Sequence, residues 1–91
     1  PGLSSARFAI TPGSRYDGRQ LGDSKARTRT GCSIVAVVRG DGVYAAPGPR
    51  TELRAGDVVV AIGSEAGLAD LATILAMSPE DDPFPLPNDV H

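Results

Sequence analysis

Basic side chains are the most chemically capable residues of this chain. Eight of its nine basic residues are arginine, and the ninth is Lys25. The planar guanidinium of arginine donates paired hydrogen bonds to phosphate and carboxylate groups. Arg27 and Arg29 lie beside Lys25, where a predicted helix ends. Two interpretations of the two arginines stay open: they stabilise the helix terminus alone, or they form an anion site between the helix and the next strand.

Side chains with catalytic potential do not combine into a catalytic set. The single cysteine, Cys32, begins an apolar run, and the single histidine, His91, is the last residue. A thiol nucleophile requires a neighbouring base, so Cys32 is interpreted as a small buried thiol. Neither a Walker loop nor a dinucleotide fingerprint can be aligned. The sequence therefore predicts no enzyme, no metal site and no cofactor.

The charge pattern also disfavours nucleic-acid binding. The formal net charge is -2, and the acids Asp17 and Asp23 lie among Arg15, Arg19 and the arginines that follow. The chain has two tyrosines, two phenylalanines and no tryptophan, so it has no array of stacking aromatics. A nucleic-acid interface needs a strong basic excess or such an array. We predict that neither DNA nor RNA is a partner.

Four apolar stretches are predicted to form strands. Two of them, residues 32–38 and 58–62, are short and uninterrupted, a pattern typical of central strands covered on both faces. Asp41-Gly42, between apolar runs, predicts a hairpin, and Pro47 and Pro49 prevent the returning strand from continuing. The predicted strands are residues 6–11, 32–38, 43–46 and 58–62.

Two helices are predicted around these strands, which makes the fold class α+β. The first helix is mostly polar and begins near Gly18, with Asp17 as N-cap and Gln20 as its capping-box partner. Gly31 fits the left-handed position that ends it. The second helix begins after Ser64. Its apolar face, which should lie on the sheet, consists of Leu68, Leu71, Ala72 and Leu75.

The chain is predicted to form one domain over residues 6–77, followed by an acidic, proline-rich tail over 78–91. Four prolines and four acids in that tail favour an extended or disordered segment. A domain of this size has a thin core and often needs oligomerisation to become stable. Because no stretch is long and apolar enough to span a membrane, the sequence predicts a cytoplasmic protein.

Three segments, in this order, resemble the C-terminal domain of regulators of potassium conductance, also called the RCK_C or TrkA-C domain. They are residues 13–21, 26–39 and 49–57, and the resemblance covers about residues 6–75. It implies a small βαβββα-type sheet with helices packed on it. It also implies a homodimer that binds small ligands between its subunits and controls a potassium channel, a cation transporter or a cation/proton antiporter.

Several members of that family are receptors for cyclic di-AMP, and the resemblance places their binding motif on residues of this chain. Ser33 stands where the motif has asparagine, and Lys25 stands where an aspartate is usual. Lys25 and Arg29 are possible phosphate contacts. The residues implied to bind the ligand are Leu21, Arg27, Cys32, Ser33, Ile34 and Pro49.

Two hypotheses for the function follow. In the first, the chain is a cytosolic regulatory domain, peripheral to a membrane transporter, that binds cyclic di-AMP at a homodimer interface and gates the transporter. In the second, it is a dimerisation or protein-interaction module without a ligand, whose arginines contact acidic partners. Binding of cyclic di-AMP separates the two.

Overall fold

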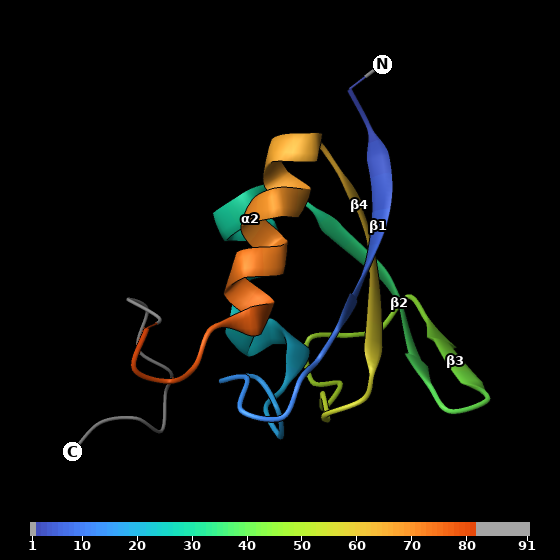
Figure 1. Ribbon diagram of the computed structural model, residues 1–91. Coiled ribbons are helices and arrows are strands. Elements are labelled where there is room, and N and C mark those ends of the chain that lie inside the picture. Colours follow the sequence, from blue (N-terminus) through green and yellow to red (C-terminus); the bar gives the residue numbers. More distant parts are fainter. Residues whose placement is uncertain (1, 82–91) are drawn as a thin grey trace.

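The computed structural model describes residues 2–81, which form a four-stranded antiparallel sheet with helices packed against it (Figure 1). The strand order is β1-β4-β2-β3. The elements are β1 (Ser4–Ala9), a 3₁₀ helix η1 (Leu21–Ser24), α1 (Ala26–Thr30), β2 (Ser33–Arg39), β3 (Gly42–Ala45), β4 (Val58–Gly63) and α2 (Glu65–Ala76). This order confirms the predicted α+β class and its βαβββα sequence of elements.

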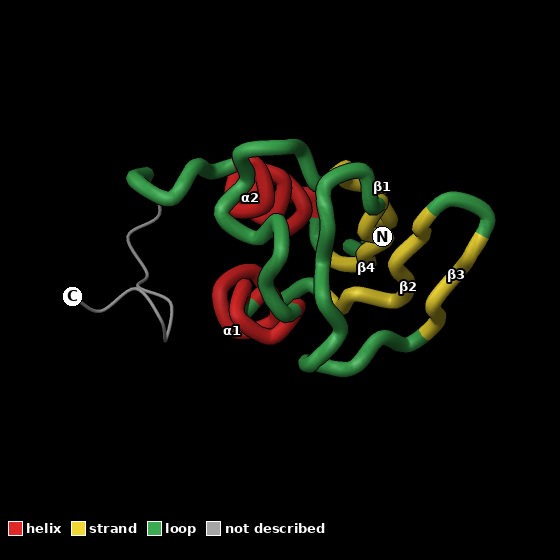
Figure 2. Tube along the Cα trace, turned by 90° about the horizontal axis from the view of Figure 1, so that it is seen from below, coloured by secondary structure: helices red, strands yellow, loops and turns green. Residues whose placement is uncertain are grey.

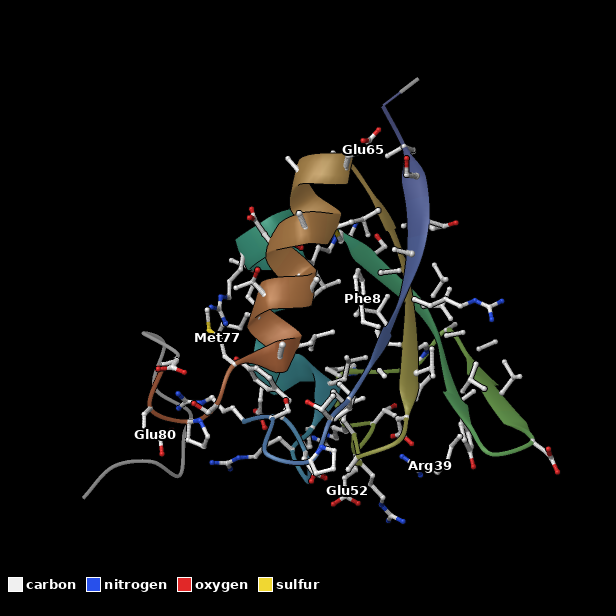
Figure 3. All side chains as sticks on the ribbon, viewed as in Figure 1. Phe8, Arg39, Glu52, Glu65, Met77 and Glu80 are labelled. Carbon is white, nitrogen blue, oxygen red and sulfur yellow. The ribbon has the colours of Figure 1, made fainter. Side chains whose placement is uncertain are left out.

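The core lies between the helices and one face of the sheet. Phe8 of β1 and Val37 of β2 both pair with Val59 of β4. Since paired residues of neighbouring strands point to the same face, all three side chains lie toward the helices, as the labelled Phe8 shows (Figure 3). Leu71 and Leu75 of α2 are buried against this layer, as the helical spacing predicted.

The prediction that the central strands are covered on both faces is wrong for the single chain. Both helices lie on the same side of the sheet (Figure 2), so the other side has no cover within residues 2–81. We call this the open face; Val43 is 65% exposed there and Ile62 is 39% exposed. By strand register, its apolar side chains are Ala9, Ala36, Val38, Val43, Ala45, Val58, Val60 and Ile62.

The predicted first helix is also wrong in its extent and in its cap. Only η1 and α1 are helical, and Lys25 between them has left-handed backbone angles, with φ 48°. Asp17 is not an N-cap, because its Oδ1 accepts a hydrogen bond from the Ala55 N–H, 2.9 Å away. The backbone before η1 pairs instead with a distant segment: the Gly18 N–H donates to the Leu53 oxygen. Pairing across the chain thus replaces the first helical turns.

Local signals were interpreted correctly elsewhere. Gly31 ends α1 in the left-handed conformation, and the Ser64 side chain caps α2 by accepting a hydrogen bond from the Gly67 N–H. The turn at 40–41 joins β2 and β3. The first strand, predicted from residue 6, begins at Ser4. Residues 82–91 of the predicted tail lie outside the described residues, so the division at residue 77 stays a prediction.

Candidate functional site

A hollow of about 320 Å³ opens where η1, α1, the start of β2 and the loop after β3 meet. We call it the basic pocket, because its charged lining residues are Lys25 and Arg27. All six residues predicted to bind a ligand line it: Leu21, Arg27, Cys32, Ser33, Ile34 and Pro49. Residues up to 28 positions apart in sequence are thereby brought to one place.

The first wall of the pocket is the junction of η1 and α1, and backbone hydrogen bonds fix its shape. The Lys25 N–H donates to the Gly22 oxygen at 3.1 Å, and the Lys25 oxygen accepts from the Arg29 N–H at 2.9 Å. Left-handed angles cost a non-glycine residue on the order of 1 kcal/mol. The junction therefore holds a lysine in a conformation that glycine would adopt more easily.

The second wall is the beginning of β2. Cys32 is fully buried just before the strand, which confirms that its thiol is part of the packed interior. Ser33 and Ile34 are half-buried and lie on opposite faces of the sheet. Ser33 pairs with Ile62, so it belongs to the open face, whereas Ile34 pairs with Ala61 and packs against the core. The pocket thus reaches the edge of the open face.

The third wall is the loop that carries Pro47 and Pro49. Its position depends on an antiparallel ribbon formed by residues 18–22 and 49–53. The Gly22 N–H donates to the Pro49 oxygen at 2.8 Å, and the Leu21 N–H donates to the Thr51 oxygen at 2.7 Å. A Cβ atom at Gly22 would lie 2.9 Å from the Pro49 Cβ, so glycine is needed where the two segments touch.

The two cations of the pocket have no protein partner in the part of the chain that the structure describes. Both Lys25 and Arg27 are exposed, and neither forms an ion pair or a side-chain hydrogen bond with another residue of 2–81. Asp23, the nearest acid in sequence, does not line the pocket; its Oδ2 accepts from the Gln20 N–H at 3.3 Å. The pocket therefore presents two uncompensated positive charges.

Arg29, the other predicted phosphate contact, lies elsewhere. Its Nη1 donates to the Tyr16 hydroxyl at 3.1 Å and to the Ser24 oxygen at 3.5 Å. It lines a separate hollow of about 310 Å³ together with Asp70 and residues of the end of α2. The structure thus separates Arg29 from Arg27, which the sequence had grouped together.

Five further residues line the basic pocket that sequence reasoning did not include among the ligand contacts: Gly22, Ser24, Ala26, Thr28 and Pro47. Most of them are small, and their side chains leave space instead of offering a distinctive group. These residues line the pocket because of the bend at Lys25 and the ribbon of residues 18–22 and 49–53. Neither feature has a local signal in the sequence.

A second charged cluster lies at the opposite end of β2 and was not predicted. Arg39 donates from Nε to Asp57 Oδ1 at 2.8 Å and from Nη2 to Asp57 Oδ2 at 2.7 Å. The same Nη2 also donates to the Glu52 oxygen at 2.9 Å (Figure 3). The Arg54 N–H supplies a third hydrogen bond to the Asp57 carboxylate, at 2.9 Å.

These contacts shift the pKa values of both partners. The hydrogen bonds from Arg39 hold the pKa of the buried Asp57 carboxyl below its ordinary value, with help from the Arg54 backbone. The hydrogen bond to Asp57 raises the pKa of the Arg39 guanidinium. The sequence did contain a signal for this pair: Arg39 follows Val38, Asp57 precedes Val58, and those valines are paired in neighbouring strands.

Residues 2–81 contain no group of three metal-ligating side chains. Within the same residues, no helix is long and apolar enough to cross a membrane. The pocket itself combines two cations with hydroxyl and apolar side chains.

Comparison with known proteins identifies relatives of this chain. The sequence profile of the TrkA-C domain matches residues 6–76. Potassium channel protein 1 of Methanocaldococcus jannaschii is 36% identical over 65 residues, which are 71% of this chain and 20% of that protein. The chain therefore spans about a fifth of the curated relative that it matches.

Solved structures share the fold. The RCK_C domain dimer of S. agalactiae BusR in complex with cyclic di-AMP has a TM-score of 0.72 at 24% identity, over 79% of this chain and 95% of that one. The RCK C domain of the potassium transport protein KtrA, also in complex with cyclic di-AMP, has a TM-score of 0.72 at 25% identity, over 78% and 81%. BusR has also been solved with its busAB promoter DNA.

Proposed function

Because this chain belongs to the TrkA-C domain family, we propose that it is the ligand-binding regulatory domain of a potassium or cation/proton transport system, with cyclic di-AMP as its ligand. TrkA-C domains are regulatory and not catalytic, in agreement with the prediction that the chain is not an enzyme. The absence of a DNA partner stays a prediction. The proposal places the domain on the cytosolic side of a membrane transporter that it gates.

The observation that carries the proposal is the convergence of six motif residues on one pocket. Arg27 supplies the guanidinium that would bind a phosphate. Leu21, Ile34 and Pro49 supply apolar surface for the faces of a base, and the Ser33 hydroxyl is a hydrogen-bonding group for its edge. The volume of about 320 Å³ lies at the lower end of the range for ligand pockets, which suits one nucleotide half of a dinucleotide.

A homodimer would complete such a site. Cyclic di-AMP has two equivalent halves, and a two-fold symmetric dimer offers each half the same pocket. The open face supports self-association, because its centre is apolar and reaches Ser33 at the pocket rim. A second copy packed there would bury these side chains and lie beside the ligand. Ligand binding would then favour one dimer geometry over others, which is what regulation of an attached transporter requires.

The test is calorimetric titration of the wild-type domain and of Arg27→Ala with cyclic di-AMP. We expect binding to the wild type and a loss of at least tenfold in Arg27→Ala, since a charge-assisted bond to phosphate contributes about 1.5 to 3 kcal/mol. Arg54→Ala is the matched control, because Arg54 is exposed and does not line the pocket. An absence of heat with the wild type contradicts the ligand, and equal affinity in Arg27→Ala contradicts the site.

Self-association is tested separately by sedimentation velocity. Val60 lies at the centre of the open face, so Val60→Asp should convert a dimer to monomers and weaken ligand binding together. If the wild type stays monomeric with and without ligand, the proposal that two subunits share one ligand is contradicted.

The second hypothesis, a module without a ligand, makes the opposite prediction in thermal melts. A ligand present at about 100 times its dissociation constant adds roughly 2.7 kcal/mol to the free energy of unfolding. A melting temperature that does not respond to any nucleotide of a panel would favour the interaction module.

A further inference from the structure

The charge of the basic pocket exceeds what a cyclic dinucleotide brings to it. Lys25 and Arg27 both line the pocket, and no carboxylate does. In a dimer each pocket would face one phosphodiester, which carries a single negative charge. A single diester would leave one positive charge per subunit uncompensated inside the hollow.

We infer that each pocket is built for a phosphate group with two negative charges, a phosphomonoester, in addition to the singly charged diester. A phosphomonoester carries about 1.5 to 2 negative charges at pH 7, because its second ionisation has a pKa near 6. Two adjacent cations without a protein partner in residues 2–81 match that charge. The inference rests on the proposed function, since it takes the ligand to be an adenine nucleotide.

The backbone at Lys25 supports this assignment independently of charge. Lys25 and Ala46 are the two non-glycine residues with positive φ in the described chain, at 48° and 49°. Lys25 lies in one wall of the pocket, and Ala46 directly precedes Pro47 in another. Residues held in such strained conformations concentrate at ligand-binding sites. Lysine at this position provides an ammonium group to the pocket in spite of the strain. Glycine would adopt the same backbone angles more easily but would provide only backbone atoms.

Neighbouring groups do not remove this charge. The ionisable side chains in the lining are Lys25, Arg27 and Cys32, and Asp23, the acid of the adjoining 3₁₀ helix, accepts a hydrogen bond from the Gln20 N–H. The ligand's own phosphomonoester changes its charge between pH 5.5 and 7.5, because its second ionisation has a pKa near 6.

A pH-dependent titration tests the inference. The probes are cyclic di-AMP, which has only diesters, and linear 5′-phosphorylated di-adenylate, which adds one terminal monoester. Binding of the linear ligand should weaken about two- to threefold from pH 7.5 to 5.5, as its monoester loses one charge with a pKa near 6. Binding of cyclic di-AMP should not change over the same range.

Variants assign the effect to Lys25. In Lys25→Met and Lys25→Gln the linear ligand should bind about threefold to fivefold more weakly at pH 7.5, the size expected for one exposed ion pair, and its pH dependence should disappear. Arg54→Met, outside the pocket, should retain both the affinity and the pH dependence. Circular dichroism of each variant verifies that it is folded.

The outcomes separate this inference from the proposed function. If cyclic di-AMP binds and the affinity for the linear ligand does not change with pH, the inference is overturned and the proposed function stays intact. A linear ligand that binds with the expected pH dependence, without any binding of cyclic di-AMP, supports the inference and overturns the proposed ligand. If neither nucleotide binds, both are overturned, and a Lys25→Met variant that keeps the pH dependence overturns the role of Lys25.

Discussion

Arg39 and Arg27 lie near opposite ends of the β2 region, and their surroundings differ in almost every respect. Arg39 makes two hydrogen bonds with a buried carboxylate and a third with a backbone oxygen. Arg27 is exposed, lies two residues from another cation and has no acid in the pocket that it lines. The same residue type supports the structure in one place and, in the other, is an exposed group that we propose as a ligand contact. The difference lies in whether the fold supplies the counter-charge.

The largest effect is expected where the charge is fully paired. Asp57→Asn should lower the free energy of unfolding by about 3 kcal/mol, because it removes the carboxylate that accepts from Arg39 and the Arg54 backbone. Urea denaturation measures this loss. If the free energy of unfolding changes by less than about 0.5 kcal/mol, the pairing of Arg39 with Asp57 does not support the fold, and Arg39 does not differ from Arg27 in this respect.

Acid should act on the same pair. Since the pKa of Asp57 is lowered in the folded state, its contribution to stability is present above the ordinary carboxyl pKa of about 4 and is lost as the pH falls further. The difference in unfolding free energy between wild type and Asp57→Asn should therefore shrink from pH 6 to pH 2.5. A difference that stays constant would contradict the assignment of the pKa shift to this carboxyl.

At the basic pocket the expected change in stability has the opposite sign. Lys25→Gly should raise the free energy of unfolding of the unliganded domain by about 0.5 to 1 kcal/mol, because glycine adopts positive φ without strain. Ala46→Gly relieves similar strain without altering charge. If Lys25→Gly loses ligand affinity while Ala46→Gly retains it, the pocket keeps its lysine for binding at a cost in stability.

The smallest effect is expected at an exposed ion pair whose two residues are hydrogen-bonded to the Arg39–Asp57 pair through their backbones and not through their side chains. Arg54 and Glu52 meet at 3.1 Å, but their side chains are 62% and 49% exposed. Glu52→Gln should therefore change the free energy of unfolding by less than about 0.5 kcal/mol. Thermal melts in low and high salt measure it, and a loss comparable to that of Asp57→Asn would show that burial is not what separates strong pairs from weak ones.

The sequence predicted those features that depend on a few neighbouring residues. Gly31 and Ser64 end and begin helices where expected, and the hairpin at Asp41-Gly42 joins the expected strands. Features that depend on distant pairing were missed. The helix expected from Gly18 is replaced by a ribbon with residues 49–53, whose sequence alone gives no sign of that partner.

The same division applies to the candidate site. The resemblance to a family supplied positions from three segments, and these positions line one pocket. Arg29 shows that residue type alone does not decide which arginine lines the basic pocket. Two residues along a helix correspond to a rotation of about 200°, so Arg27 and Arg29 point to different sides of α1. Helical geometry applied to the sequence is therefore sufficient to separate the two arginines.

The ribbon of residues 18–22 and 49–53 has a kinetic consequence. Its strands are separated by about thirty residues, and closing such a loop is slow compared with forming a hairpin or a helical turn. Since Gly22 holds the loop of Pro49 in place, the basic pocket should be completed late in folding. A ligand bound there would recognise contacts absent from the folding transition state, so it should slow unfolding while leaving the folding rate unchanged.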